Sequence, residues 1–174
     1  MRLPALMAIV VGSLGLYVNG TEAARVRLPV ADNPYCSIAT YKARDVAEQA
    51  MSVSDSSGRP VIVVNAGTLK DDPSYGRFLM AHECCHHSLG HVNRYREGRG
   101  AVGPQPFFYI APALKQMELD ADCCAARLLR ERQEADGIEA ARETMTRFGA
   151  VPTGAYYPTG TERADNIATC AQRD

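Results

Sequence analysis

The sequence predicts a single α+β domain that is mostly helical with a short sheet, and three observations lead to this. The chain of 174 residues is long enough for one compact domain with a hydrophobic core, and too short for two of ordinary size. Several segments have the composition and periodicity of helices, whereas residues 61–64 have the β-branched composition of a strand. The chain is 46% hydrophobic and 22% charged, with a net charge of −1, so we expect no nucleic acid and no anionic membrane surface as partner.

The N-terminus has the order of features of a secretory signal peptide. A short basic head precedes an apolar run from Leu3 to Val18, and small and polar residues follow it. This order predicts a signal peptide over residues 1–23, cleaved after Ala23. The run is short for a spanning helix, which needs about 20 apolar residues, although an uncleaved anchor is the alternative. We therefore expect a mature domain of residues 24–174, periplasmic or secreted, without stable membrane insertion.

The first half of the mature chain is expected to contain a helix, a turn and a strand. Apolar residues recur at helical spacing from Ser37 to Met51, which predicts a modest amphipathic helix. Residues 54–60 are a turn by composition, since Ser, Asp, Gly and Pro dominate them. The strand, taken over Val61–Asn65, is expected either in the core or at a sheet edge, where an extended peptide could add to it.

The second half is expected to consist of helices and loops. Residues 71–74, Asp-Asp-Pro-Ser, open a helix from about Tyr75 to Leu89, and Gly90 stops it. Residues 92–112 are rich in Gly, Pro and Arg and are expected to form a long loop. Three further helices are expected, over Ala113–Gln133, Ile138–Phe148 and Glu162–Ala171.

The first strong helix contains the sequence His82-Glu83-Cys84-Cys85-His86. Two histidines four residues apart lie one turn from each other on the same helix face, so both imidazoles reach one metal ion. Glu83 lies about 100° round the helix from His82, where it reaches a metal-bound water without binding the metal. Zinc with three protein ligands keeps one position for water, whose pKa it lowers to about 7. The motif thus predicts a Zn²⁺ site with Glu83 as catalytic base.

A second acidic motif follows on the next strong helix. Glu118 and Asp122 lie four residues apart, again on one helix face. Glu118 can complete a site of two histidines and one glutamate, and Asp122 can bind the outer nitrogen of a ligand histidine. The alternative is that both helices carry only solvated charged faces, but solvation requires no such register.

These two motifs, in this order, resemble the gluzincin zinc metallopeptidases, in particular the small soluble relatives of the HtpX and CAAX-prenyl-protease group. The resemblance covers about residues 60–170 and implies a zincin-like fold, zinc as cofactor and a peptide or protein substrate. By this resemblance His82, His86 and Glu118 are the metal ligands and Glu83 is the catalytic base. Asp122 is the residue that hydrogen-bonds a ligand histidine from outside the metal's coordination sphere.

A weaker match lies near the end of the chain, at residues 158–163. Family members usually carry His-Pro just before this acidic-Arg segment, whereas this chain has Tyr157-Pro158. Tyr157, Tyr156 and Arg163 are therefore the candidates for stabilising the oxyanion that forms when the scissile carbonyl is attacked. A surface or packing role is the alternative for each of them.

Two further histidines flank the motif. On an unbroken helix His91 faces away from His82. A break at Gly90 would let His91 swing back as a third ligand, but metzincin-like sites place that histidine one residue later. His87 is expected either to be exposed or to contact a metal ligand without binding the metal itself.

Six cysteines complete the set of candidate residues: Cys36, Cys84, Cys85, Cys123, Cys124 and Cys170. After export, disulfides are favoured, whereas in a reducing compartment the two Cys-Cys pairs would suggest a thiolate metal site. If the two site helices pack together, Cys84 and Cys85 come near Cys123 and Cys124, and Cys36 with Cys170 would tie the ends. Unpaired buried cysteines are the alternative.

Two other classes of protein compete with the peptidase. The chain could be a non-catalytic exported zinc-binding or chaperone-like domain that keeps the scaffold, but a purely structural site has no use for Glu83. A redox or metal-storage protein built on the cysteine pairs is the third possibility.

Overall fold

The computed structural model describes residues 28–44, 46, 48–94, 107–154 and 156–172, with the backbone alone described for residues 107–111. The predicted signal peptide and most of the predicted loop 92–112 lie outside the described residues. The described elements, in chain order, are β1 (Ala39–Ala43), β2 (Ala50–Ser54), β3 (Pro60–Asn65), α1 (Ala66–Asp71), α2 (Pro73–Ser88), α4 (Phe107–Glu131), α5 (Ala135–Phe148) and α6 (Gly160–Gln172). The prediction of a small, mostly helical α+β domain is confirmed.

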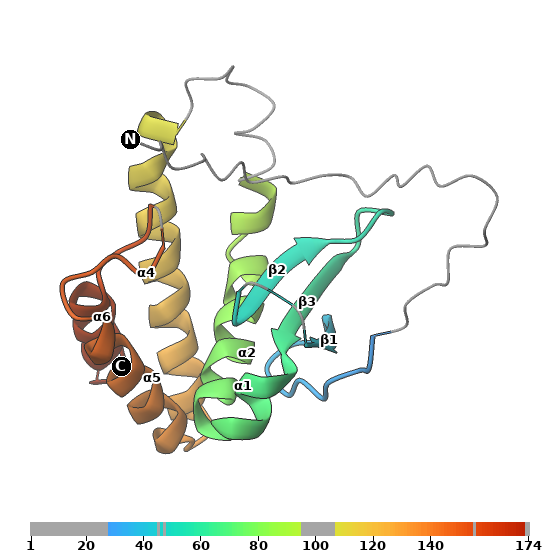
Figure 1. Ribbon diagram of the computed structural model, residues 1–174, viewed down its shortest axis with the longest axis horizontal. Helices are drawn as coiled ribbons and strands as arrows, with labels where there is room; N and C mark the ends of the chain where they lie inside the picture. Colours follow the sequence, from blue (N-terminus) through green and yellow to red (C-terminus); the bar gives the residue numbers. More distant parts are fainter. Residues whose placement is uncertain (1–27, 45, 47, 95–106, 155, 173–174) are drawn as a thin grey trace, which may run out of the picture.

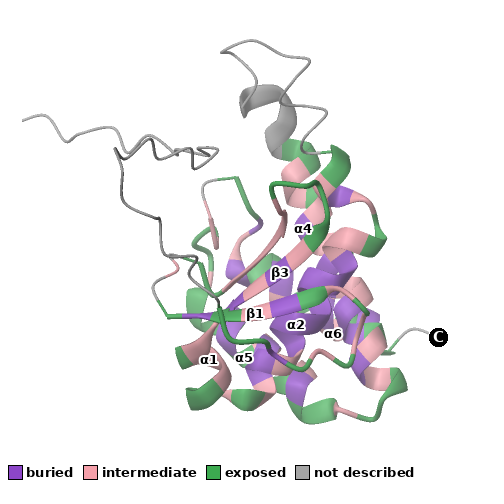
Figure 2. Ribbon diagram, turned by 90° about the vertical axis from the view of Figure 1, so that its right-hand side faces the viewer, coloured by how far each residue is buried: buried purple, intermediate pink, exposed green. Residues whose placement is uncertain are grey.

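Helix α2 is the central element of the fold. Figure 1 shows it between the sheet on one side and α4, α5 and α6 on the other. Its residues from Tyr75 to Cys85 are buried apart from the half-buried Arg77, as expected of a helix that is covered on most of its surface. Ile62 and Val64 of the sheet pack with its Met80, so β3 lies against α2. Figure 2 shows this buried region running through α2 and the helices behind it.

The ends of α2 are the ones that the sequence predicts. The Asp72 carboxylate accepts a hydrogen bond of 2.9 Å from the Tyr75 N–H, and Pro73 occupies the first helical position. The helix ends before Gly90, whose φ of +72° places it in the left-handed region that glycine tolerates best.

The sheet has the strand order β1-β3-β2, with β3 parallel to β1 and antiparallel to β2. The predicted turn joins β2 to β3, where the Asp55 carboxylate accepts hydrogen bonds from the backbone N–H groups of Ser57 and Arg59. Both sides of β3 are occupied, so the prediction that Val61–Asn65 could be a sheet edge that binds a peptide is wrong. Among the described residues, β2 lies at an edge of the sheet and contacts α2.

The predicted helix over Ser37–Met51 is also wrong, because β1 and the start of β2 occupy this segment. Residues 39–43 pair with β3, and residues 50–54 pair with its other side. The pairing satisfies the backbone hydrogen bonds of both segments and lets Ala50 pack against the core. A strand partner distant in sequence therefore outweighed a weak local helical pattern.

The predicted loop 92–112 is wrong at both described ends. Residues 92–94 are helical, and helix α4 begins at Phe107, so residues 107–112 are helical as well. Pro112 lies inside the helix, where it removes a single hydrogen bond to the fourth residue before it. The loop prediction extended too far because the residues before it are rich in Gly and Pro. The predictions for α5 and α6 are confirmed, with Gly149 at φ +57° after the last residue of α5.

Three disulfides join Cys36 to Cys84, Cys85 to Cys124 and Cys123 to Cys170, and among the described residues no cysteine is free. The predicted cross-link between α2 and α4 is confirmed by the Cys85–Cys124 bond. The predicted Cys36–Cys170 bond is wrong, because α6 packs on α4 and so brings Cys170 to Cys123. Adjacent helical residues point about 100° apart, which lets Cys84 reach the segment before β1 while its neighbour reaches α4.

The disulfides also limit the alternatives for this chain. All six cysteines are paired, so they offer no thiolates for a metal site or for metal storage. Disulfides persist in oxidising compartments, which fits an exported protein. No helix in the described part of the chain is both long and apolar enough to cross a membrane.

Removal of the α2–α4 cross-link is expected to destabilise the protein. The Cys85–Cys124 bond closes a chain separation of 39 residues, and the Cys85→Ala/Cys124→Ala variant should lose about 2–4 kcal/mol in the free energy of unfolding, measured in urea. The matched control is Cys123→Ala/Cys170→Ala, whose separation of 47 residues predicts a similar loss without releasing α2. Peptide mapping without reduction should recover the three pairs above, and any other pairing would contradict this arrangement.

Candidate metal centre

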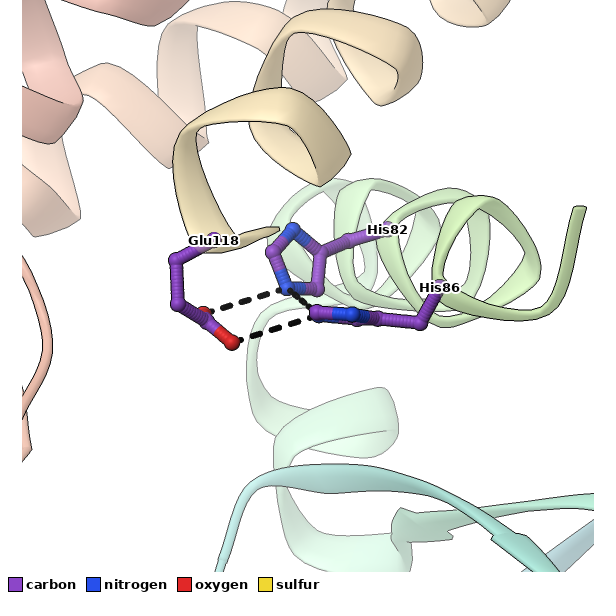
Figure 3. Close-up of side chains that lie close together, drawn as sticks. All are labelled: His82, His86 and Glu118. Carbon is purple, nitrogen blue, oxygen red and sulfur yellow. Dashed lines mark hydrogen bonds and ion pairs between the residues drawn. The ribbon is translucent and has the colours of Figure 1, made fainter. Parts of the chain in front are cut away.

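The structure brings His82, His86 and Glu118 together (Figure 3). The Nε2 atoms of the two histidines lie 2.9 Å apart. Glu118 Oε1 is 3.3 Å from His86 Nε2, and Glu118 Oε2 is 3.5 Å from His82 Nε2. One ligand atom from each residue lies within 4.8 Å of the other two, so this buried group could hold a metal ion.

Helix packing explains how residues so distant in sequence meet. Both histidines come from one face of α2, one turn apart, while Glu118 comes from α4. Helix α4 presents Ala121 and Ala125, both fully buried, to the core, and such small side chains let helices approach closely. The Cys85–Cys124 bond fixes the same contact covalently.

Asp122 supports the site from the far side of His82. Its Oδ1 lies 2.9 Å from His82 Nδ1, the ring nitrogen that does not face Glu118, and Asp122 is fully buried. This is the placement that the sequence predicted for Asp122. Such a carboxylate orients the imidazole and leaves its other nitrogen for a metal.

Arg163 from α6 holds Asp122 in turn. Its Nε and Nη2 donate hydrogen bonds of 2.8 and 2.7 Å to the two carboxylate oxygens of Asp122, and Nη2 lies 3.5 Å from Glu118 Oε2. Arg163, one of the candidates for stabilising the oxyanion, therefore lies behind the metal ligands. Its positive charge is buried and balances the negative charges of Asp122 and Glu118. Sequence reasoning had given it no such contact.

The charges of the group shift its pKa values strongly. Burial lowers the pKa of His82, but Asp122 and Glu118 outweigh it and raise the pKa to about 10. Burial raises the pKa of Glu118, while His82 and His86 hold it well below its usual range. A proton thus occupies the histidine–glutamate group when no metal is bound. A cation that binds there must displace this proton, because ligand histidines bind metals in the neutral form.

Glu83 lies beside the ligands and is buried, with 6% of its surface exposed. Its carboxylate Oε2 accepts a hydrogen bond of 2.6 Å from the Ser52 hydroxyl, which also lies 2.8 Å from the Glu83 backbone oxygen. Ser52 belongs to β2, and the sequence analysis missed it. A single serine in a segment expected to lie between a helix and a turn carries no signal of such a contact.

His91 lies closer to the site than expected. The chain turns at Gly90, and His91 Nδ1 comes within 3.1 Å of His86 Nδ1, with 3% of the residue exposed. The expectation that it faces away is wrong, because the left-handed turn ends the helix before it. It is not part of the ligand group, and burial and the nearby His86 lower its pKa to about 4. His87 Nε2 instead contacts the Val61 backbone oxygen at 3.2 Å.

The two tyrosines of the α5–α6 connection are half exposed, Tyr157 at 40% and Tyr156 at 39%. Burial of the Tyr157 hydroxyl raises its pKa, and the negative charges of Glu118 and Glu83 act in the same direction. The Tyr157 phenol therefore remains protonated and lies within electrostatic reach of the site carboxylates.

Comparisons of the chain with protein-family models, with curated proteins and with solved structures found no match. The fold and the site themselves define a class: an α+β protein with a candidate metal centre of two histidines and one glutamate. Its two ligand-bearing helices are joined by a disulfide.

Proposed function

We propose that this protein is an exported zinc metalloendopeptidase of the gluzincin type, periplasmic or secreted. One observation carries the proposal: a buried His82–His86–Glu118 group lies next to a glutamate, Glu83, that is held apart from it. A purely structural metal site needs four protein ligands and no base. Three ligands with an adjacent carboxylate are the arrangement of a catalytic site.

The donor set suits zinc. Two imidazole nitrogens and one carboxylate are a common ligand set of catalytic zinc sites, and the buried Glu118 carboxylate brings negative charge directly to the cation. When bound, zinc supplies a Lewis acid and an acidified water. His82 is oriented by Asp122, and His86 by His91, so both can present Nε2 to the same point.

The chain's own residues supply the rest of the chemistry. Glu83 takes a proton from the attacking water and then gives it to the leaving amine. Tyr157, protonated and close to the site carboxylates, is the better of the oxyanion candidates. Arg163 acts through Asp122 and Glu118, by fixing their positions, and does not meet the substrate.

Strand β2 is the proposed platform for the substrate. It is an edge strand among the described residues and contacts α2, and an extended peptide can add to such an edge through main-chain hydrogen bonds. Binding of this kind depends little on substrate side chains. We therefore expect cleavage of extended or unfolded polypeptides in preference to folded proteins.

The alternative is a non-catalytic zinc-binding domain on the same scaffold, and metal removal separates the two. The oxidised protein should contain about one zinc per chain and hydrolyse an unfolded polypeptide. A strong chelator should abolish hydrolysis, and one equivalent of Zn²⁺ should restore it whereas Mg²⁺, which prefers oxygen ligands, should not. Zinc without hydrolysis would favour the binding domain, and the absence of any bound metal would contradict the site itself.

A further inference from the structure

The Ser52 hydroxyl forms the contact that ties the sheet to the proposed catalytic base. Ser52 pairs with the fully buried Ile62 in the β2–β3 ladder, so its side chain lies on the sheet face that is packed against α2. From there Oγ reaches Glu83 at two points, the carboxylate at 2.6 Å and the backbone oxygen at 2.8 Å. A short hydrogen bond to a carboxylate is among the stronger hydrogen bonds in proteins.

Glu83 depends on this contact because it is buried. A carboxylate removed from water must be hydrogen-bonded or paired with a cation. Within the described part of the chain no Lys, Arg or His forms an ion pair with Glu83. Glu118 and Asp122 both have cationic partners nearby, so Glu83 differs from them in being held by a neutral hydroxyl.

We propose that Ser52 is the positioning residue of the general base: it holds the Glu83 carboxylate beside the metal ligands and out of the metal's coordination sphere. This inference rests on the proposed peptidase function. A cation in place of Ser52 would compete with the reacting water for the charge of Glu83. A hydroxyl orients the carboxylate and leaves that charge available.

Ser52 has two acceptors within reach, the carboxylate and the backbone oxygen of Glu83. A hydroxyl there suits both steps of the reaction, the uptake of the proton by Glu83 and its release to the amine. A hydroxyl has one hydrogen to donate and two lone pairs to accept with. While Glu83 is ionised, Ser52 donates to its carboxylate. Glu83 takes the proton from water on its other carboxylate oxygen, Oε1, and the serine hydrogen then stays on Oε2 or turns to the Glu83 backbone oxygen, so the new O–H remains directed at the reacting groups. The serine keeps its own proton throughout, and the transferred proton passes from water to Glu83 to the amine.

The same contact links base and substrate. Ser52 lies on the strand proposed to bind the peptide, so a peptide added to β2 is fixed relative to Glu83 through a single residue. Reacting groups misplaced by about 1 Å can lose about two orders of magnitude in rate.

The test uses the full mature, zinc-loaded protein with Ser52→Ala, Ser52→Thr and the control Ser56→Ala, which makes the same chemical change at an exposed position of the turn after β2. Ser52→Ala should lower kcat about 10–100-fold, change KM by less than about threefold and keep its zinc. Ser52→Thr retains the hydroxyl and should recover most of kcat, and Ser56→Ala should behave as wild type. In a Glu83→Gln background, Ser52→Ala should cause no further loss, because both residues act in one step.

The outcomes separate this inference from the proposed function. An active wild type whose Ser52→Ala variant keeps kcat within about twofold overturns the positioning role and leaves the peptidase proposal standing. Loss of zinc or of thermal stability in Ser52→Ala that Ser52→Thr does not recover would show a merely structural contact and overturn it too. A wild type that binds zinc but hydrolyses no peptide bond overturns both.

Discussion

Glu83→Gln is expected to lower peptidase turnover by about 10²–10⁴-fold or more while leaving about one zinc per chain. The amide has the size of the carboxylate, and its oxygen can still accept the Ser52 hydrogen bond of 2.6 Å, so the local structure should persist. An amide cannot take a proton from water at neutral pH. Glu83 is not part of the ligand group, so metal binding should not depend on it.

The measurements are turnover on an unfolded polypeptide and zinc content by elemental analysis. The matched control is Glu143→Gln, which makes the same chemical change on an exposed position of α5 and should leave turnover unchanged. A fully active Glu83→Gln enzyme would remove Glu83 from the mechanism. A variant that loses its zinc as well would make Glu83 a ligand and not a base.

Glu118→Ala is expected to strip the zinc, the largest effect on metal affinity among the site variants. The two carboxylate oxygens of Glu118 lie 3.3 Å from His86 Nε2 and 3.5 Å from His82 Nε2. Glu118 also contributes the negative charge that offsets a bound cation. Asp122→Asn should weaken zinc binding by an intermediate amount, typically 10–100-fold, since Asp122 reaches the ligand group through the outer nitrogen of His82 and is not itself a ligand. Asparagine is preferable to alanine there, because alanine would leave a cavity and remove both hydrogen bonds that Arg163 donates to Asp122.

The structure changes what is expected of His91→Ala. From the sequence this variant should leave zinc affinity nearly unchanged, because His91 was expected to face away. Its contact of 3.1 Å with His86 Nδ1 predicts instead a loss of the intermediate size, about 10–100-fold. Competition titration with a chelator ranks the three variants, and Asp120→Ala, exposed on α4, is the control that should be silent. If His91→Ala proves the worst and Glu118→Ala is nearly silent, the site must be redrawn with three histidines.

The sequence alone determined the features that depend on neighbouring residues. Asp72-Pro73 and Gly90 set the two ends of α2 through a cap, a fixed φ and a left-handed turn. The spacing of four between His82 and His86 placed both on one face, because helix geometry repeats every 3.6 residues. The same reasoning put Glu118 and Asp122 together on α4, and the structure brings them to the histidines.

Only the tertiary structure decided the features whose partners are distant in sequence. Residues 39–43 became a strand because β3 was available to pair with them, and no local pattern reports a partner some 20 residues away. The cysteines at 36 and 170 found different partners from those expected, because the packing of α6 on α4 sets which thiols meet.

The same distinction holds within the candidate site. The ligand positions follow from helix periodicity, so the sequence could predict them. The residues that support the ligands and the base, Ser52, His91 and Arg163, come from a strand, a turn and a separate helix, and contact the site through side chains alone. Local periodicity fixes which residues share a face, whereas hydrogen bonds between elements depend on how whole helices and strands pack, and that is settled by burial and pairing over the entire chain.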